Sequence, residues 1–297
     1  MISASAPSTT MLFGEHAVLT GGKALVAALN ARVTVCLEPI ESERIEIVSS
    51  LGRHVQALAD SALTAPFEFV LAAVQAFKPA KGLRLTIESE VSSTLGLGSS
   101  AAVTVATVAC LYQWLHGQEN ISEQFKLAYH AVLSVQGLGS GADIYAATFG
   151  GVQSYCIGQT TANPVNWPWR FYLCYCGYKT PTKVVLAMVE RRRLNDAESV
   201  SRSIACINQA TELALLAAKH HSLDELSEAC KLHQAAMKDL GLSTPELEQL
   251  ITSPAAKISG SGLGDCVITF VGSDTVIPED MIKLSVSNQG VCLHESA

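Results

Sequence analysis

The stretch STLGLGSSAAVT, residues 93–104, decides the fold of this chain. It joins an alternating segment, LRLTIES (83–89), to a long apolar run, SSAAVTVATVACLYQWLH (99–116). The alternation predicts a half-buried strand, and the apolar run predicts a buried helix that ends at Gly117. The sequence therefore predicts a strand, a glycine-serine turn and a helix in direct succession.

A turn of this composition at the start of a helix favours an anion site. Glycine lets backbone N–H groups approach a ligand closely, and a helix N-terminus adds unpaired donors and a positive dipole end. The hydroxyls of Ser99 and Ser100 add donors, or oxygens for a metal ion. The alternative is a tight turn in which a serine only caps the helix. The stretch is not a Walker loop, because GxxxxGK[ST] is absent.

Two further glycine-rich stretches follow. GLGSGADIYAATFGG (137–151) carries one acid, Asp143, which by itself is also typical of a turn or a helix cap. AKISGSGLGDCVITF (256–270) is a serine-glycine loop that leads into a strand-like run. Each signal is weak alone, whereas their order in one chain is specific.

Three segments together resemble the motifs of the GHMP small-molecule kinases: APSTTMLFGEHAVL (6–19), GLGSSAA (96–102) and KISGSGLGDC (257–266). The resemblance covers residues 4 to about 270. FGEHAVL is similar to the mevalonate kinases of that family, whereas QGLGSGAD and SGLGDC are closer to its phosphomevalonate kinases.

The resemblance implies an α+β fold of two domains, the first like ribosomal protein S5 and the second ferredoxin-like. It implies a kinase that uses ATP and Mg²⁺ to phosphorylate a small molecule, with mevalonate in isoprenoid precursor synthesis as the expected acceptor. Phosphomevalonate, or the metabolite acceptor of another GHMP kinase, is the alternative. A nucleotide-binding relative that has lost catalysis stays a further alternative. A monomer or a homodimer is expected.

The resemblance also implies a role for each matching residue. Asp143 corresponds to the catalytic aspartate, and Ser100 to a serine that reaches the metal ion. The residues expected to bind the nucleotide phosphates are Gly96, Leu97, Gly98, Ser99, Ser100 and Ala101. The residues expected to contact the substrate are Glu15, His16, Gly260, Ser261 and Gly262.

Two positions depart from the family pattern. Thr9 stands where the family has a lysine beside the aspartate, so Thr9 becomes a candidate catalytic residue with no positive charge. Val132 stands where mevalonate kinases tend to have a metal-binding glutamate. A magnesium ion would then be held by serine, phosphates and water, or by an acid elsewhere in the chain.

Composition excludes several classes of protein. The chain has 297 residues, of which 48% are hydrophobic and 16% charged, so it can form a large core. The net charge of −7 argues against a nucleic-acid partner. The nine cysteines are dispersed without CxxC, which favours a reducing compartment. Neither a signal peptide nor a membrane-length apolar run is present, so we expect a cytoplasmic protein without a membrane partner.

A connector, GQTTANPVNWPW (158–169), separates the two predicted domains, 1–165 and 166–297. GYKTPTKVV (177–185) is predicted to be a polar loop that contributes to the acceptor site. Ser222-x-x-Glu225 and Ser243-x-x-Glu246 both match the capping-box pattern of a helix start. The second domain is predicted to contain helices near 195–220, 222–240 and 244–252, and strands at 265–271 and 282–293.

Overall fold

The computed structural model describes residues 1–91, 96–279, 281–283 and 285–294. Residues 93–95 of the glycine-serine stretch lie outside this part. In chain order, the elements of the first half are β1 (Ile2–Phe13), β2 (Ala24–Ile40), β3 (Arg44–Ser49), β4 (Gly52–Ala57), α1 (Glu68–Phe77), β5 (Gly82–Ser89), α2 (Ser99–His116), α3 (Ile121–Gln136), α4 (Ala142–Phe149) and β6 (Val152–Tyr155).

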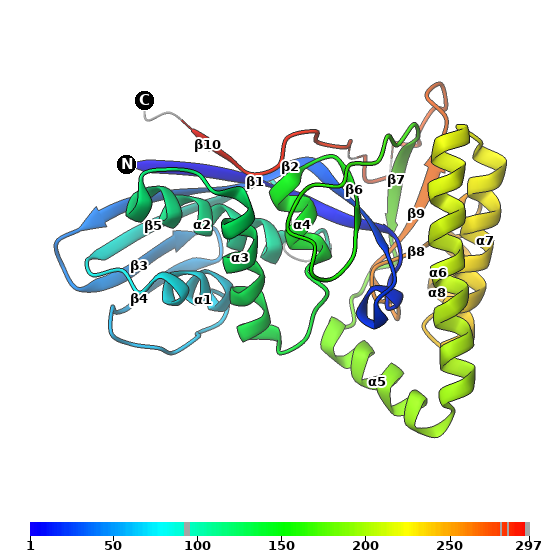
Figure 1. Cartoon of the computed structure of the whole chain (residues 1–297), viewed down its shortest axis with the longest axis horizontal. Helices are drawn as coiled ribbons and strands as arrows, with labels where there is room; N and C mark the ends of the chain where they lie inside the picture. Colours follow the sequence, from blue (N-terminus) through cyan, green and yellow to red (C-terminus); the bar gives the residue numbers. More distant parts are fainter. Residues whose placement is uncertain (92–95, 280, 284, 295–297) are drawn as a thin grey trace.

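A seven-stranded sheet carries the first half, with strand order β10-β1-β2-β5-β3-β4 and β6 also paired to β2. Helices α1 to α4 cover one face of it (Figure 1). α2 packs against β1 and β2, and α1, α3 and α4 surround it. Alternate residues of β2, Val33, Val35 and Leu37, are buried in the same core as α2, as the period of two along a strand requires.

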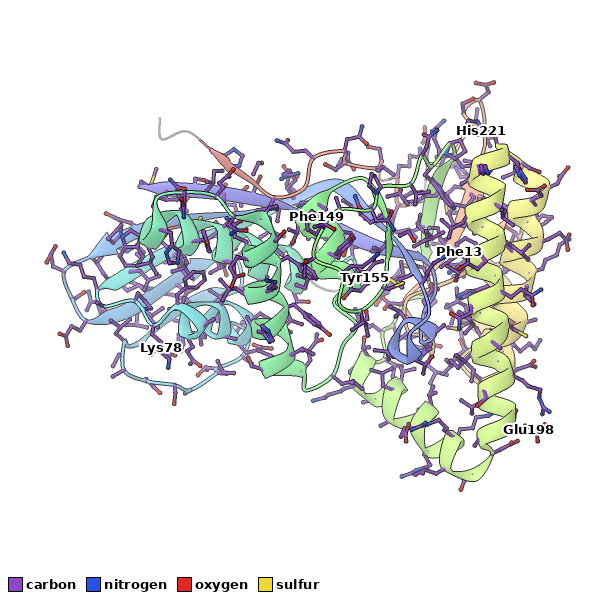
Figure 2. The ribbon with its side chains drawn as sticks, in the orientation of Figure 1. Phe13, Lys78, Phe149, Tyr155, Glu198 and His221 are labelled. Atoms are coloured by element: carbon purple, nitrogen blue, oxygen red, sulfur yellow. The ribbon has the colours of Figure 1, made fainter. Side chains whose placement is uncertain are left out.

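A three-stranded antiparallel sheet, in the order β7-β9-β8, carries the second half. Two long helices, α6 and α7, pack side by side next to it (Figure 1). In Figure 2, Glu198 and His221 mark the two ends of α6. The elements are β7 (Arg170–Tyr175), α5 (Thr182–Asn195), α6 (Ala197–His220), α7 (Leu223–Asp239), α8 (Pro245–Leu250), β8 (Ala256–Ser259), β9 (Cys266–Val271) and β10 (Cys292–His294).

The predicted strand, turn and buried helix are confirmed as β5, the Gly96–Gly98 turn and α2, which ends before Gly117. The α+β class is confirmed as well. The helix start predicted at Ser222 is also confirmed, since its hydroxyl accepts from the Glu225 N–H. The reciprocal half of the box is not formed, because the Ser222 N–H donates to the Ala217 carbonyl. The Ser243 box is wrong, because Thr244 provides the cap instead.

Two further predictions of secondary structure need correction. The polar loop predicted at 177–185 ends early, and α5 begins at Thr182; only Val185 of α5 is buried, so the helix has no apolar stripe to reveal it. Of the strand predicted at 282–293, only Cys292 and Leu293 join the strand β10, which pairs with β1. The chain therefore returns to the first sheet after completing the second, while the domain boundary near residue 165 stays a prediction.

A buried cluster of charge joins the two halves where β1 ends. The Glu15 carboxylate accepts from Lys257 Nζ of β8 at 2.7 Å and contacts His233 Nε2 of α7 at 2.7 Å. All three residues are at least 96% buried. Phe13, which is labelled in Figure 2, packs beside them. Its ring lies 5.7 Å from the His233 ring and 5.2 Å from the Lys257 ammonium.

The protonation of this cluster follows from its neighbours. Burial alone would raise the pKa of Glu15, but the charge of Lys257 and the contact with His233 hold it far below its ordinary value. Burial and the charge of Lys257 lower the pKa of His233. Glu15 is thus ionised in the folded protein, and its stabilising contribution is lost as pH falls below the range of an ordinary carboxyl group.

We expect Lys257→Met to lower the free energy of unfolding by about 3–5 kcal/mol, because it leaves the Glu15 carboxylate buried without its cation. Lys231→Met is the control, since Lys231 pairs with Glu228 on the exposed surface of α7, where such pairs contribute about 0–1 kcal/mol. Urea unfolding of both variants gives the comparison. Equal losses in the two variants would show that the cluster does not hold the halves together.

Candidate active site

The start of α2 forms the predicted glycine-serine loop. Gly98, with φ 63°, occupies the cap position, and no side chain among the described residues caps the helix. The serine-cap alternative is therefore not what the structure shows. Leu97 is buried and anchors the loop in the core. A helix start capped by glycine directs its first N–H groups toward an anion, as the helix dipole favours.

Thr9 contacts this loop through both its backbone and its side chain. The pairing of β1 with β2 shifts register between Pro7 and Thr9, and such bulges redirect a side chain. The Thr9 N–H donates to the Leu97 carbonyl at 3.0 Å. Its hydroxyl donates to Asp143 Oδ1 at 2.8 Å. The position that lacks the family lysine therefore still contacts the predicted catalytic aspartate.

Asp143 is the second residue of α4, after Gly141 in the cap position. Its carboxylate does not cap the helix; it faces the cleft and accepts from Thr9. The surrounding protein desolvates the carboxyl group and raises its pKa, although the Thr9 hydrogen bond and the charge of Lys179 both act to lower it. A positive charge therefore acts on Asp143 although Thr9 is neutral.

The first and third motifs meet through His16. Its Nε2 contacts the Ser261 carbonyl at 2.9 Å, so this nitrogen carries the proton. Burial lowers the pKa of His16 and favours the neutral ring. Glu15 also lines the cleft, but both of its carboxylate oxygens are engaged by Lys257 and His233. We therefore expect Glu15 to position His16 rather than to bind a substrate directly.

Asp265, at the end of the third motif, is a site residue that the sequence did not single out. It is 8% exposed and has a positive φ of 71°. Its Oδ1 has no hydrogen-bond partner among the described residues. It lies against Gly96, where an added Cβ would come within 1.9 Å of it. The sequence feature that could have identified Asp265 is an acid that follows glycine and other small residues.

These segments line a cleft of about 1070 Å³ between the two halves. Ala101 is instead buried in the core beneath the loop, and Gly262 packs against Leu242. The predicted site residues that line the cleft are Glu15, His16, Gly96, Leu97, Gly98, Ser99, Ser100, Asp143, Gly260 and Ser261.

Within the described part of the chain, no helix combines the length and apolarity needed to cross a bilayer.

We expect Gly98→Ala to weaken ATP binding and turnover together, each by about tenfold or more. An alanine Cβ would lie 1.9 Å from the Thr9 hydroxyl, so Thr9 and the loop must move. Gly117→Ala is a matched control, because Gly117 has a φ of 65° and open space around it. Both variants carry backbone strain of about 1–3 kcal/mol, but only Gly98→Ala also has the steric clash. Calorimetric titration of both variants with ATP therefore shows how much of the lost affinity comes from the clash. Normal ATP affinity in Gly98→Ala would contradict the close approach of backbone and phosphate.

Comparison with known proteins identifies the family of the chain. Residues 67–151 match the GHMP kinases N terminal domain, and residues 214–279 match the GHMP kinases C terminal domain. A mevalonate kinase of Archaeoglobus fulgidus is 32% identical over 301 residues, which cover 98% of this chain and 99% of that protein.

Two solved structures share the fold. A protein of Listeria innocua aligns with a TM-score of 0.84 at 20% identity over 99% of each chain. The mevalonate kinase of Methanococcus jannaschii aligns with a TM-score of 0.76 at 22% identity, covering 92% of this chain and 91% of that one. From the two domain matches and the relative that spans nearly its full length, the chain belongs to the GHMP kinase family.

Proposed function

We propose that this protein transfers the γ-phosphoryl group of ATP to the hydroxyl of mevalonate, in the cytoplasm, as a step of isoprenoid precursor synthesis. The observation that carries the proposal is the position of Asp143, held by Thr9 beside the start of α2. Phosphoryl transfer needs positioned phosphates, compensated charge and a group that orients the nucleophile. The cleft supplies each of these from a different segment.

The reaction assigns one task to each segment. The loop 96–100 and the start of α2 hold the ATP phosphates through backbone N–H groups. Asp143 orients the acceptor hydroxyl and takes its proton. The acceptor oxygen forms the new bond to the γ-phosphorus, while the bond from that phosphorus to the bridging oxygen of ADP breaks. Thr9 keeps the Asp143 carboxylate in place through its hydrogen bond.

The site also fits a magnesium ion. Mg²⁺ in kinases uses one or two carboxylates together with substrate phosphates. Asp265 offers a buried carboxylate oxygen that has no hydrogen-bond partner among the described residues and lies against the loop. Ser100 offers a hydroxyl on the cleft wall. Bound there, the ion would neutralise phosphate charge. Among the described residues, no group of three or more His, Cys, Asp or Glu side chains could hold a metal ion without the nucleotide.

Mevalonate is the proposed acceptor because the Archaeoglobus fulgidus relative is a mevalonate kinase. The lysines among the described residues that line the cleft are Lys179 and Lys183, and no arginine lines it there. An acceptor that already carries a phosphate would need more positive charge. A coupled ADP-release assay with mevalonate, phosphomevalonate and galactose tests this. Turnover of phosphomevalonate alone, or of none of the three, would reject the proposal.

Asp143→Asn is expected to lower kcat by about 10²–10⁴-fold, the usual contribution of a general base, with little change in ATP affinity. Thr9→Ala removes one hydrogen bond to a carboxylate, about 1.5 kcal/mol, so its kcat should fall by only about tenfold. Because burial raises the pKa of Asp143, the wild-type kcat should begin to fall above the ordinary aspartate pKa of about 3.9 as the pH is lowered. Steady-state kinetics from pH 4 to 8 measures all three effects, and wild-type turnover in Asp143→Asn would place the base elsewhere.

Turnover should require a divalent metal ion and should stop in excess chelator. Asp265→Asn should raise the Mg²⁺ concentration needed for half-maximal rate by about tenfold or more, because an amide replaces a charged ligand. Asparagine tolerates the positive φ at this position, so the backbone should be preserved. Mn²⁺ binding in the presence of ATP, followed by electron paramagnetic resonance, gives a readout independent of rate. An unchanged Mn²⁺ affinity would remove Asp265 from the metal site.

A further inference from the structure

Lys179 lies in the segment between β7 and α5, where it lines the cleft. This segment is joined to the third motif by hydrogen bonds from both directions. The Cys176 N–H donates to the Asp265 carbonyl at 3.0 Å, and the Asp265 N–H donates to the Tyr178 carbonyl at 2.9 Å. The Thr180 hydroxyl donates to the Leu263 carbonyl. Lys179 therefore lies between Tyr178 and Thr180, which are both hydrogen-bonded to the third motif. These bonds fix the backbone position of Lys179.

The ammonium group of Lys179 has carboxylates as its neighbours. Its Nζ lies 3.6 Å from Asp265 Oδ2. Its positive charge also acts on Asp143, where it opposes the effect of burial on the carboxyl pKa. Two acids and one lysine thus share the part of the cleft that faces the start of α2. Without ligand, the lysine is held in place by Asp265 and stays 36% exposed in its side chain.

The other cations near the cleft are less well placed. Thr9 supplies no positive charge. The Lys257 ammonium already donates to Glu15 and to the Ile258 carbonyl. Lys183 lines the cleft from the first turn of α5, and no ion pair joins it to either aspartate among the described residues. Phosphoryl transfer concentrates negative charge on the γ-phosphate oxygens, and a lysine held close to them stabilises that charge.

We propose that Lys179 is a catalytic residue whose ammonium group contacts the γ-phosphate of ATP and stabilises the charge that develops on it during transfer. This inference rests on the proposed kinase function. Lys179 takes no part in proton transfer, so the balance of the reaction is unchanged: the acceptor proton goes to Asp143, and ADP leaves with the bridging oxygen. Asp265 holds the lysine in place until the nucleotide arrives.

The test compares Lys179→Met with Lys179→Arg, and uses Lys126→Met as a control, since Lys126 pairs with Glu123 on the exposed surface of α3. We expect Lys179→Met to lower kcat by about 10²–10³-fold, the usual effect of removing one donor to a developing charge. Lys179→Arg should retain most of the turnover. Lys126→Met should match the wild type.

Binding measurements separate this role from a purely structural one. Calorimetric titration with a non-hydrolysable ATP analogue and with ADP gives the share of affinity that depends on the γ-phosphate. Lys179→Met should weaken binding of the ATP analogue by about tenfold and leave the affinity for ADP unchanged. Equal loss of both nucleotides, or unchanged kcat, would overturn the role of Lys179.

The same measurements distinguish this inference from the proposed function. If the wild type turns over mevalonate while Lys179→Met does so equally well, the lysine assignment fails and the kinase function stands. If the wild type phosphorylates none of the acceptors, the proposed function fails. In that case a selective loss of the ATP analogue in Lys179→Met would still support the γ-phosphate contact, and equal affinities would reject it.

Discussion

A single buried carboxylate, Glu15, determines how the halves of this molecule meet. It lies just beyond β1, and among the described residues its carboxylate contacts Lys257 from β8 and His233 from α7. A carboxylate removed from water is costly unless a cation and hydrogen bonds compensate it. The first motif is thus bound to the second sheet, and the neighbouring His16 is brought to the carbonyl of Ser261 in the third motif.

The phosphate loop depends on the same strand at its other side. The register shift before Thr9 frees its backbone N–H from regular pairing and lets it donate to Leu97. Gly98 then approaches so closely that a side chain there would collide with the Thr9 hydroxyl. The hydroxyl has Asp143 as its acceptor. One irregularity in β1 therefore couples the glycine-serine loop to the Asp143 carboxylate.

The features predictable from sequence were those encoded over short distances. The strand, turn and helix around Gly98 follow from local patterns. The placement of Asp143 in the same site was implied by the resemblance to the kinase family, because its contact with Thr9 joins distant segments. α5 was missed because a helix with one buried residue has no periodic stripe. Asp265 was missed because its role comes from contacts with Gly96 and Lys179, which lie far away in the chain.

The placement of positive charge in the cleft has a physical explanation. Thr9 is fully buried, so a lysine at that position would need its ammonium compensated before any nucleotide arrived. Lys179 instead sits on a segment at the cleft wall, where its side chain keeps partial contact with water and pairs with Asp265. A partly solvated ammonium has a smaller desolvation penalty in the empty enzyme. The backbone of Asp265 is hydrogen-bonded to the segment that carries Lys179. The Asp265 carboxylate therefore keeps the Lys179 ammonium in position for the nucleotide.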